Sequence, residues 1–79
     1  MQLQELKKLV EYKSVGRLLV TRYCDGWTLS AQKKGDTAET FTRSNTLETA
    51  RGGFREFKTL DAVASLVRNE LSDHKFIVF

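Results

Sequence analysis

The sequence predicts a small α+β domain whose elements follow one another in the order α-β-β-β-β-α-β. Three observations support this prediction: an amphipathic segment at the start, β-prone segments in the middle, and a second amphipathic segment followed by bulky apolar residues. We expect an antiparallel sheet that is packed on one face by the two helices. A chain of 79 residues is of single-domain size, so residues 1–79 are expected to share one core.

The first helix is predicted over residues 2–13. Its apolar side chains recur at helical spacing between charged and amide side chains, and Ser14 and Gly16 end the pattern. The apolar stripe is narrow, so this helix needs a surface on which to lie. The stripe consists of Leu3, Leu6, Leu9 and Val10.

A β-hairpin is predicted next, with strands over residues 17–24 and 27–33. Asp25-Gly26 lies between them, and Asp-Gly is a strong signal for a type I′ turn, in which both central residues have a positive φ. The second strand alternates apolar and polar side chains, so we expect one buried face and one face in water. The expected buried face carries Trp27, Leu29 and Ala31, and the expected wet face carries Thr28, Ser30 and Gln32.

Two further extended regions are predicted after a turn at residues 33–36. The first is a polar strand over residues 37–43, and the second is a short hairpin in which residues 47–50 and 55–58 pair across Gly52-Gly53. The glycine pair suits a turn with a positive φ. It does not suit a phosphate-binding loop, because it does not lead into a helix with a following lysine.

The second helix is predicted to begin near Thr59, a good N-cap, with Asp61 in the first turn complementing the helix dipole. Its apolar face ends before Ser72, and the bulky run Phe76–Phe79 then forms a strand. Such a strand must be covered on both faces, so we expect it to pair inside the sheet or across a dimer. The expected core consists of Leu6, Leu9, Val10, Leu18, Val20, Trp27, Leu29, Phe57, Leu60, Val63, Val67, Leu71, Phe76 and Val78.

The composition argues against a disulfide-linked, zinc-binding or membrane-spanning protein. Cys24 is the single cysteine, so no internal disulfide forms, and one Cys with one His falls short of a zinc site. We therefore expect a reducing, cytoplasmic location, with no metal and no cofactor. No segment approaches the apolar length of a membrane span, and charged residues interrupt the start of the chain, unlike in a signal peptide. A domain this small is marginally stable alone, which favours a homodimer.

Catalytic chemistry is not predicted. His74 lies in a polar turn without an acid or nucleophile arranged around it in sequence, and Cys24 lies beside Asp25 with no cation to activate its thiol. The acidic residues give no close carboxylate pair. We therefore expect a protein that is not an enzyme.

The last third of the chain resembles a known group. Residues 49–64 read Thr-Ala-Arg-Gly-Gly-Phe-Arg-Glu-Phe-Lys-Thr-Leu-Asp-Ala-Val-Ala, and an apolar helix and Phe76-Ile77-Val78 follow. This pattern, with residues 6–15 and Gly26-Trp27, resembles the ParC-like partition-associated proteins carried on bacterial plasmids and integrative elements. The resemblance implies a setting in plasmid maintenance, in which a partner protein of a maintenance complex is expected.

Two surfaces are candidates for function. The first is an interface at the terminal apolar strand, made of Phe76, Ile77, Val78 and Phe79, through which a non-enzymatic accessory protein would self-associate and bind a protein partner. The alternative is a sheet-based DNA-binding surface, favoured by the net charge of +3 and by basic side chains near an aromatic residue. Its candidate residues are Lys33, Lys34, Arg43, Arg51, Arg55 and Lys58.

Overall fold

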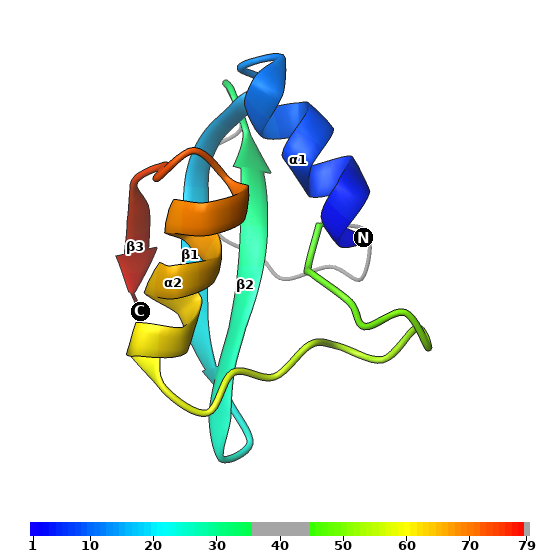
Figure 1. Cartoon of the computed structure of the whole chain (residues 1–79), viewed down its shortest axis with the longest axis vertical. Coiled ribbons are helices and arrows are strands. Elements are labelled where there is room, and N and C mark those ends of the chain that lie inside the picture. Colours follow the sequence, from blue (N-terminus) through cyan, green and yellow to red (C-terminus); the bar gives the residue numbers. More distant parts are fainter. Residues whose placement is uncertain (36–44, 79) are drawn as a thin grey trace.

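A computed structural model describes residues 1–35 and 45–78 of the chain. It confirms the α+β class, with two helices packed on a mixed sheet (Figure 1). Thr59 caps the second helix as predicted, because its hydroxyl accepts a hydrogen bond from the backbone N–H of Ala62 at 3.1 Å. The elements are α1 (Leu3–Glu11), β1 (Val15–Tyr23), β2 (Gly26–Lys33), α2 (Leu60–Glu70) and β3 (Phe76–Val78).

The three strands form a sheet in the order β2-β1-β3. β1 and β2 are antiparallel, as the predicted hairpin requires, but β3 runs parallel to β1, with Leu18 opposite Phe76 and Val20 opposite Val78. The prediction of a wholly antiparallel sheet was therefore wrong. The reason is the connection: α2 returns the chain across the sheet, so β3 enters it in the same direction as β1. The strand predicted over residues 37–43 lies outside the described residues.

Residues 45–58, called here the edge segment, follow the outer edge of β2. The backbone N–H of Leu47 donates to the carbonyl oxygen of Leu29 at 2.8 Å. Further along, Trp27 and Phe57 exchange two backbone hydrogen bonds of 2.7 and 2.8 Å. The segment therefore extends the sheet at two places without forming a regular strand.

Between these two places the edge segment leaves the sheet as a tight hairpin. The N–H of Thr49 donates to the carbonyl oxygen of Gly53 at 2.7 Å, and Glu48 forms a bridge with Phe54. Gly52 has a φ of 95°, which explains one glycine of the pair. A pairing across Gly52-Gly53 is thus present, but as the isolated bridge between Glu48 and Phe54 and not as the two strands predicted over residues 47–50 and 55–58.

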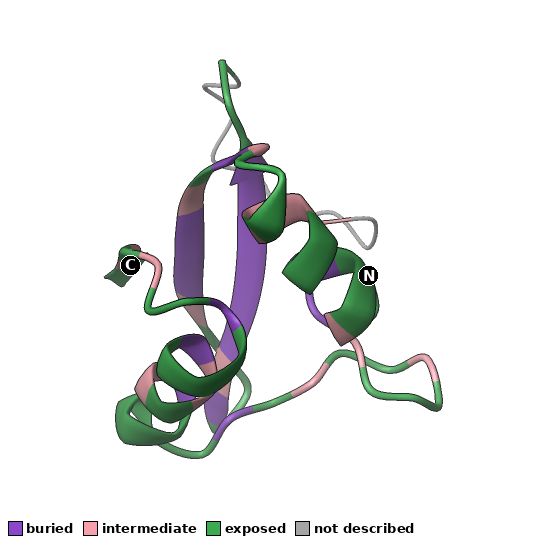
Figure 2. Ribbon diagram, turned by 45° about the horizontal axis from the view of Figure 1, so that its top comes forward, coloured by how far each residue is buried: buried purple, intermediate pink, exposed green. Residues whose placement is uncertain are grey.

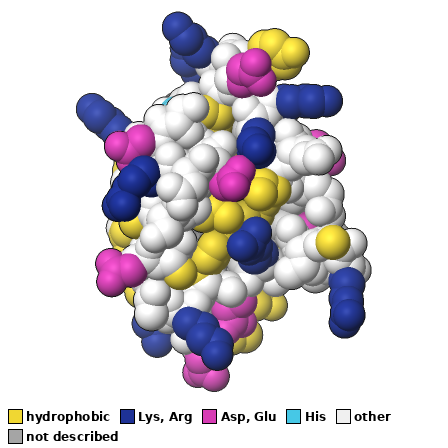
Figure 3. Space-filling model, viewed as in Figure 1, with side chains coloured by type: hydrophobic (Ala, Val, Ile, Leu, Met, Phe, Trp, Pro, Cys, Tyr) yellow, Lys and Arg dark blue, Asp and Glu magenta, His cyan; other side chains and the backbone are white. Residues whose placement is uncertain are grey.

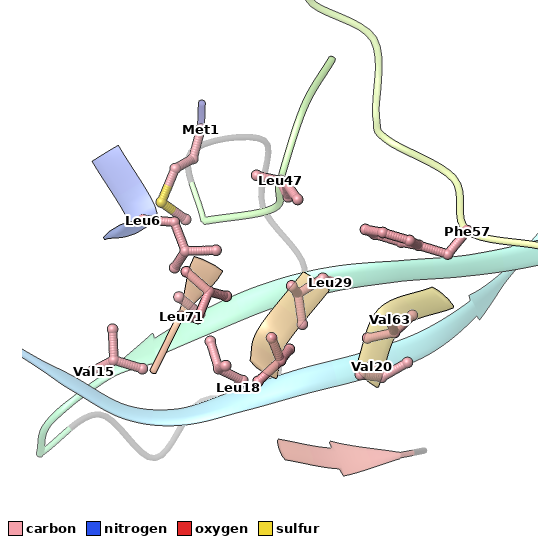
Figure 4. Close-up of a cluster of buried hydrophobic side chains, with 12 residues drawn as sticks. Met1, Leu6, Val15, Leu18, Val20, Leu29, Leu47, Phe57, Val63 and Leu71 are labelled. Atoms are coloured by element: carbon pink, nitrogen blue, oxygen red, sulfur yellow. The ribbon is translucent and has the colours of Figure 1, made fainter. Parts of the chain in front are cut away.

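Both helices pack on the same face of the sheet (Figure 2), and their buried side chains meet those of β1 and β2 (Figure 4). Two members of the expected core, Leu60 and Val78, are exposed instead. Leu60 opens the first turn of α2, and Val78 lies on a strand at the sheet edge. The fully buried side chains include Leu6, Leu18, Val20, Leu29, Leu47, Val63, Val67 and Leu71.

The first residue of the chain joins α1 to the edge segment. The amino group of Met1 donates to the carbonyl oxygen of Thr46 at 3.0 Å and forms an ion pair with the carboxylate of Glu48. The N–H of Glu48 in turn donates to the carbonyl oxygen of Met1 at 2.7 Å. The Met1 side chain is buried in the core, where the sequence had given no reason to expect it.

The polar face predicted for β2 is buried and not wet. Thr28, Ser30 and Gln32 are all buried, and each has a hydrogen-bonding partner. The hydroxyl oxygens of Ser30 and Thr46 lie 2.9 Å apart, which brings together residues from β2 and the edge segment. The alternation of apolar and polar side chains did not indicate that the polar face is exposed. Hydroxyl and amide side chains can be buried when they form hydrogen bonds, as they do here.

Gly26 is important for a different reason from the one predicted. Tyr23 pairs with Gly26, so the turn residues are Cys24 and Asp25, and of these only Cys24 has a positive φ, of 53°. The type I′ turn with Gly26 at its centre was therefore wrong. Gly26 instead admits the edge segment: a Cβ at this position would lie 2.5 Å from the carbonyl oxygen of Phe57.

We expect Gly26→Ala to destabilise the fold by about 1–3 kcal/mol, because the added methyl group overlaps a backbone atom that cannot move freely. The matched control is Gly53→Ala, where an added Cβ meets nothing within 4 Å and the expected change is within about 0.5 kcal/mol. Urea denaturation measures both. Equal stabilities of the two variants would show that the edge segment does not press on β2 at Gly26.

Val67→Asp is expected to abolish folding, because Val67 is completely buried and its surroundings offer a carboxylate no cationic partner in the described core. Ser65→Asp adds the same group on the exposed side of α2 and is expected to leave the melting temperature nearly unchanged. Circular dichroism during heating compares the two. A Val67→Asp variant that unfolds cooperatively, with the same change in circular dichroism as wild type, would contradict the packing of α2.

Candidate functional site

β3 is the edge strand of the described sheet. One side of it pairs with β1, and within residues 1–35 and 45–78 no strand pairs with its other side. In a parallel ladder, alternate residues direct their backbone N–H and C=O groups away from the neighbouring strand. The outer side of β3 therefore presents backbone groups that another extended chain can bind.

The side chains of this edge are apolar on both faces of the sheet. Phe76 and Val78 lie on the face that carries the helices, opposite Leu18 and Val20, while Ile77 lies on the other face. Ile77 is 39% and Val78 is 43% exposed, and Phe76 is partly buried. Phe79, the fourth residue of the predicted interface, lies outside the described residues. Within the described part of the chain, the edge thus combines backbone groups that have no strand partner with exposed aliphatic surface.

A hollow of about 730 Å³ adjoins the beginning of β3. Arg17 of β1 lines it on one side, and Asp73, His74 and Lys75 line it from the loop between α2 and β3. Arg17 is already engaged, since its Nε donates to the Oε1 of Gln32 at 2.6 Å. The charged groups of the loop lie next to the apolar edge and can make polar contacts with a chain bound there.

The predicted basic residues fall into separate groups. Lys33 ends β2 and Lys34 follows it, whereas Lys58 precedes α2 at the opposite end of the sheet. Phe57 pairs with Trp27, six residues from Lys33, which corresponds to about 20 Å along a strand. Figure 3 shows Lys and Arg side chains spread over the helical face and interspersed with Asp and Glu.

The remaining members of the basic set occupy different positions on the edge segment. Arg51 lies in the exposed turn of its hairpin. Arg55 shares a face with Phe57, as the alternation predicted, and its guanidinium carbon lies 5.2 Å from the centre of the Phe57 ring. Arg43 lies outside the described residues. The structure therefore does not bring Lys33 and Lys34 together with Arg55 and Lys58.

A cluster that sequence reasoning missed lies at the turn end of the β1–β2 hairpin. The guanidinium of Arg22 lies 5.2 Å from the ring centre of Trp27, its partner across the two strands. The rings of Tyr23 and Phe54 meet edge to face, with centroids 5.8 Å apart. The Arg22–Trp27 pair depends on the turn at Cys24-Asp25. The predicted turn at Asp25-Gly26 would have placed Cys24 opposite Trp27, so the sequence did not predict this pair. The position of Phe54 depends on the path of the edge segment and could not be predicted either.

The described residues contain neither a metal-binding cluster nor a helix that could span a membrane. No group of three or more His, Cys, Asp and Glu side chains that could hold a metal ion occurs within residues 1–35 and 45–78. Neither of the two helices in this part of the chain has the length and apolar character needed to cross a membrane. Cys24 is an exposed free thiol at the hairpin turn, away from His74 in the loop before β3.

Comparisons with known proteins gave no neighbour: no family model, no curated protein and no solved structure matches this chain. The resemblance to ParC-like partition-associated proteins, which depends on short motifs in residues 49–64 and at β3, stays a prediction.

Proposed function

We propose that this chain is a non-enzymatic accessory protein that assembles by self-association and binds a protein partner. The observation that carries the proposal is the outer edge of β3, where free backbone groups and the exposed Ile77 and Val78 side chains coincide. Edge strands that present aliphatic surface are the usual sites of strand addition. The sequence resemblance supports a setting in the maintenance of a bacterial plasmid or mobile element.

A second copy of the chain is the occupant that best fits this edge. A two-fold axis at Ile77 pairs two β3 strands in antiparallel orientation and joins the two sheets into one continuous sheet. Lys75 and its copy then lie at opposite ends of the pair, about 13 Å apart along the strands. This separation exceeds the Debye length at physiological salt, so their repulsion is largely screened.

The length of β3 limits the strength of this association. Three residues offer few backbone hydrogen bonds, and each contributes about 1 kcal/mol net. The aliphatic area of Ile77 and Val78 adds to them on both faces of the sheet. We therefore expect a weak, concentration-dependent homodimer, whose formation is favoured where a partner complex raises the local concentration.

DNA binding by the six predicted basic residues acting together is the less supported alternative. Lys33 and Lys34 lie at one end of β2, and Lys58 lies at the other. A single stretch of phosphate backbone would have to cross the whole sheet to reach both groups.

Ile77→Lys is expected to abolish dimer formation, because it places a charge at the two-fold axis next to its own copy. Tyr12→Lys is the matched control, since Tyr12 is an exposed aromatic residue that follows α1 and shares a hollow with Lys33 of β2, at the opposite edge of the sheet from β3. Sedimentation equilibrium over a range of protein concentrations measures the association constant. Wild type and Tyr12→Lys are expected to dimerise equally, and Ile77→Lys to remain a monomer.

Thermal denaturation of the same variants checks that Ile77→Lys is folded. A wild-type chain that remains strictly monomeric at high concentration would overturn the self-association, and so would a folded Ile77→Lys variant that dimerises normally.

A further inference from the structure

The hollow beside the start of β3 differs from the strand edge in its charge. β3 lies at the outside of the sheet and is wholly apolar (Figure 1). Ile77 lines the hollow together with four polar or charged side chains, those of Arg17, Asp73, His74 and Lys75. A chain that binds the outer side of β3 therefore meets an aliphatic surface and a charged surface at the same place.

Arg17 and Ile77 lie on the same face of the sheet, the one opposite the helices. Leu19 pairs with Ile77 in the ladder between β1 and β3, and side chains two residues apart along a strand share a face. Arg17 precedes Leu19 by two residues, and Lys75 precedes Ile77 by two. The register, continued by two residues, therefore places Lys75 beside Arg17, and both residues line the hollow.

The charged groups of the hollow are positive in sum. Arg17 and Lys75 are cationic, Asp73 is anionic, and His74 is neutral at pH 7. Arg17 donates to the Oε1 of Gln32, so it acts on a bound chain mainly through its charge. In the part of the chain that the structure describes, neither Lys75 nor Asp73 forms an ion pair. The exposed Lys75 is thus the group that an acidic side chain can reach.

An extended chain added along β3 brings its side chains to this hollow at a fixed spacing. Its side chains alternate between the two faces of the sheet, and neighbours on one face are about 7 Å apart. Ile77 and Lys75 are separated by the same two positions. An aliphatic side chain beside Ile77 and an acidic side chain two residues along therefore match the strand edge and the hollow together.

A second copy of the chain supplies only part of this match. β3 (Phe76–Val78) contains no acidic residue, so a second β3 strand covers Ile77 and brings no carboxylate to Lys75. A partner segment that carries an acidic residue makes the same backbone hydrogen bonds and adds an ion pair. We therefore expect such a segment to compete with the second copy for the edge.

We propose that the protein partner binds the β3 edge as an extended segment, with an aliphatic residue beside Ile77 and an acidic residue beside Lys75. This inference rests on the strand addition proposed above and names the chemistry of the partner. A nucleic acid offers phosphates to Lys75, but it has neither the backbone amides nor the aliphatic side chains that a strand edge binds. The homodimer and the complex with the partner then exclude one another.

A synthetic peptide serves as the probe. Its sequence is Ser-Glu-Val-Ile-Val-Glu-Ser, with fluorescein on the amino end and an amide at the carboxyl end. A glutamate lies two positions from the central isoleucine on each side, so the peptide fits the edge in either direction. Two control peptides carry glutamine or lysine in place of both glutamates. Fluorescence anisotropy at low and high salt measures binding.

Wild type is expected to bind the glutamate peptide about 2-fold to 5-fold more tightly than the glutamine peptide, as for one exposed ion pair. The lysine peptide is expected to bind least, and high salt to remove the differences. A saturating concentration of the glutamate peptide is expected to convert homodimers into monomers that carry the peptide. Sedimentation equilibrium measures this conversion.

Reversing the charge at Lys75 is the decisive change. Lys75→Glu is expected to invert the order of the peptides, so that the lysine peptide binds most tightly. Lys8→Glu is the matched control, since it reverses an exposed lysine of α1 that lines a different hollow, together with Lys33 of β2. This control is expected to keep the wild-type order. Thermal denaturation shows whether each variant is folded.

Three results would overturn the acidic partner. They are equal or absent binding of the three peptides by wild type, a folded Lys75→Glu variant that keeps the wild-type order, and displacement of the probe by oligothymidylate as readily as by unlabelled glutamate peptide. If the wild-type chain still dimerises through β3, only this inference fails. A wild-type chain that is strictly monomeric and binds none of the peptides would overturn the proposed function as well.

Discussion

The fold depends on how closely the edge segment can approach β2. The carbonyl oxygen of Phe57 lies only 2.5 Å from where a Cβ at position 26 would be, and this close approach accompanies the backbone pairing of Phe57 with Trp27. The same path places Leu47 and Phe57 in the core and sets the starting point of α2. The absence of a side chain at one glycine thus permits the close approach of the edge segment at Phe57, next to the start of α2.

This arrangement also determines which surfaces are left for binding. The edge segment occupies the outer side of β2 at two places, so the open side of the described sheet is that of β3. The hairpin within the edge segment carries Phe54 to Tyr23 and completes a small hollow there. This hollow and the open edge of β3 therefore lie in different parts of the sheet.

The sequence predicted the elements better than their relations. α2 was predictable because the spacing of its apolar residues and the N-cap Thr59 are local signals. The β1–β2 hairpin was predictable because two β-prone segments flank a short turn. The burial of Ser30 was not predictable, since Thr46, its hydrogen-bonding partner, is distant in the chain. The parallel direction of β3 depends on the path of the connection. Gly26 was predicted to act as a turn residue. Its contact with the distant Phe57 could not be predicted from the neighbouring residues in the sequence.

The parallel pairing of β3 with β1 also bears on how the molecule folds. It joins Leu18 to Phe76, so the chain must close a very long loop before the first backbone bond between these strands can form. The hairpin and α2 need only nearby residues and are free to form earlier. β3 is therefore expected to dock late and to detach first during local fluctuations. Each detachment uncovers the edge of β1, so newly made chains at high concentration are exposed to pairing with the wrong strand.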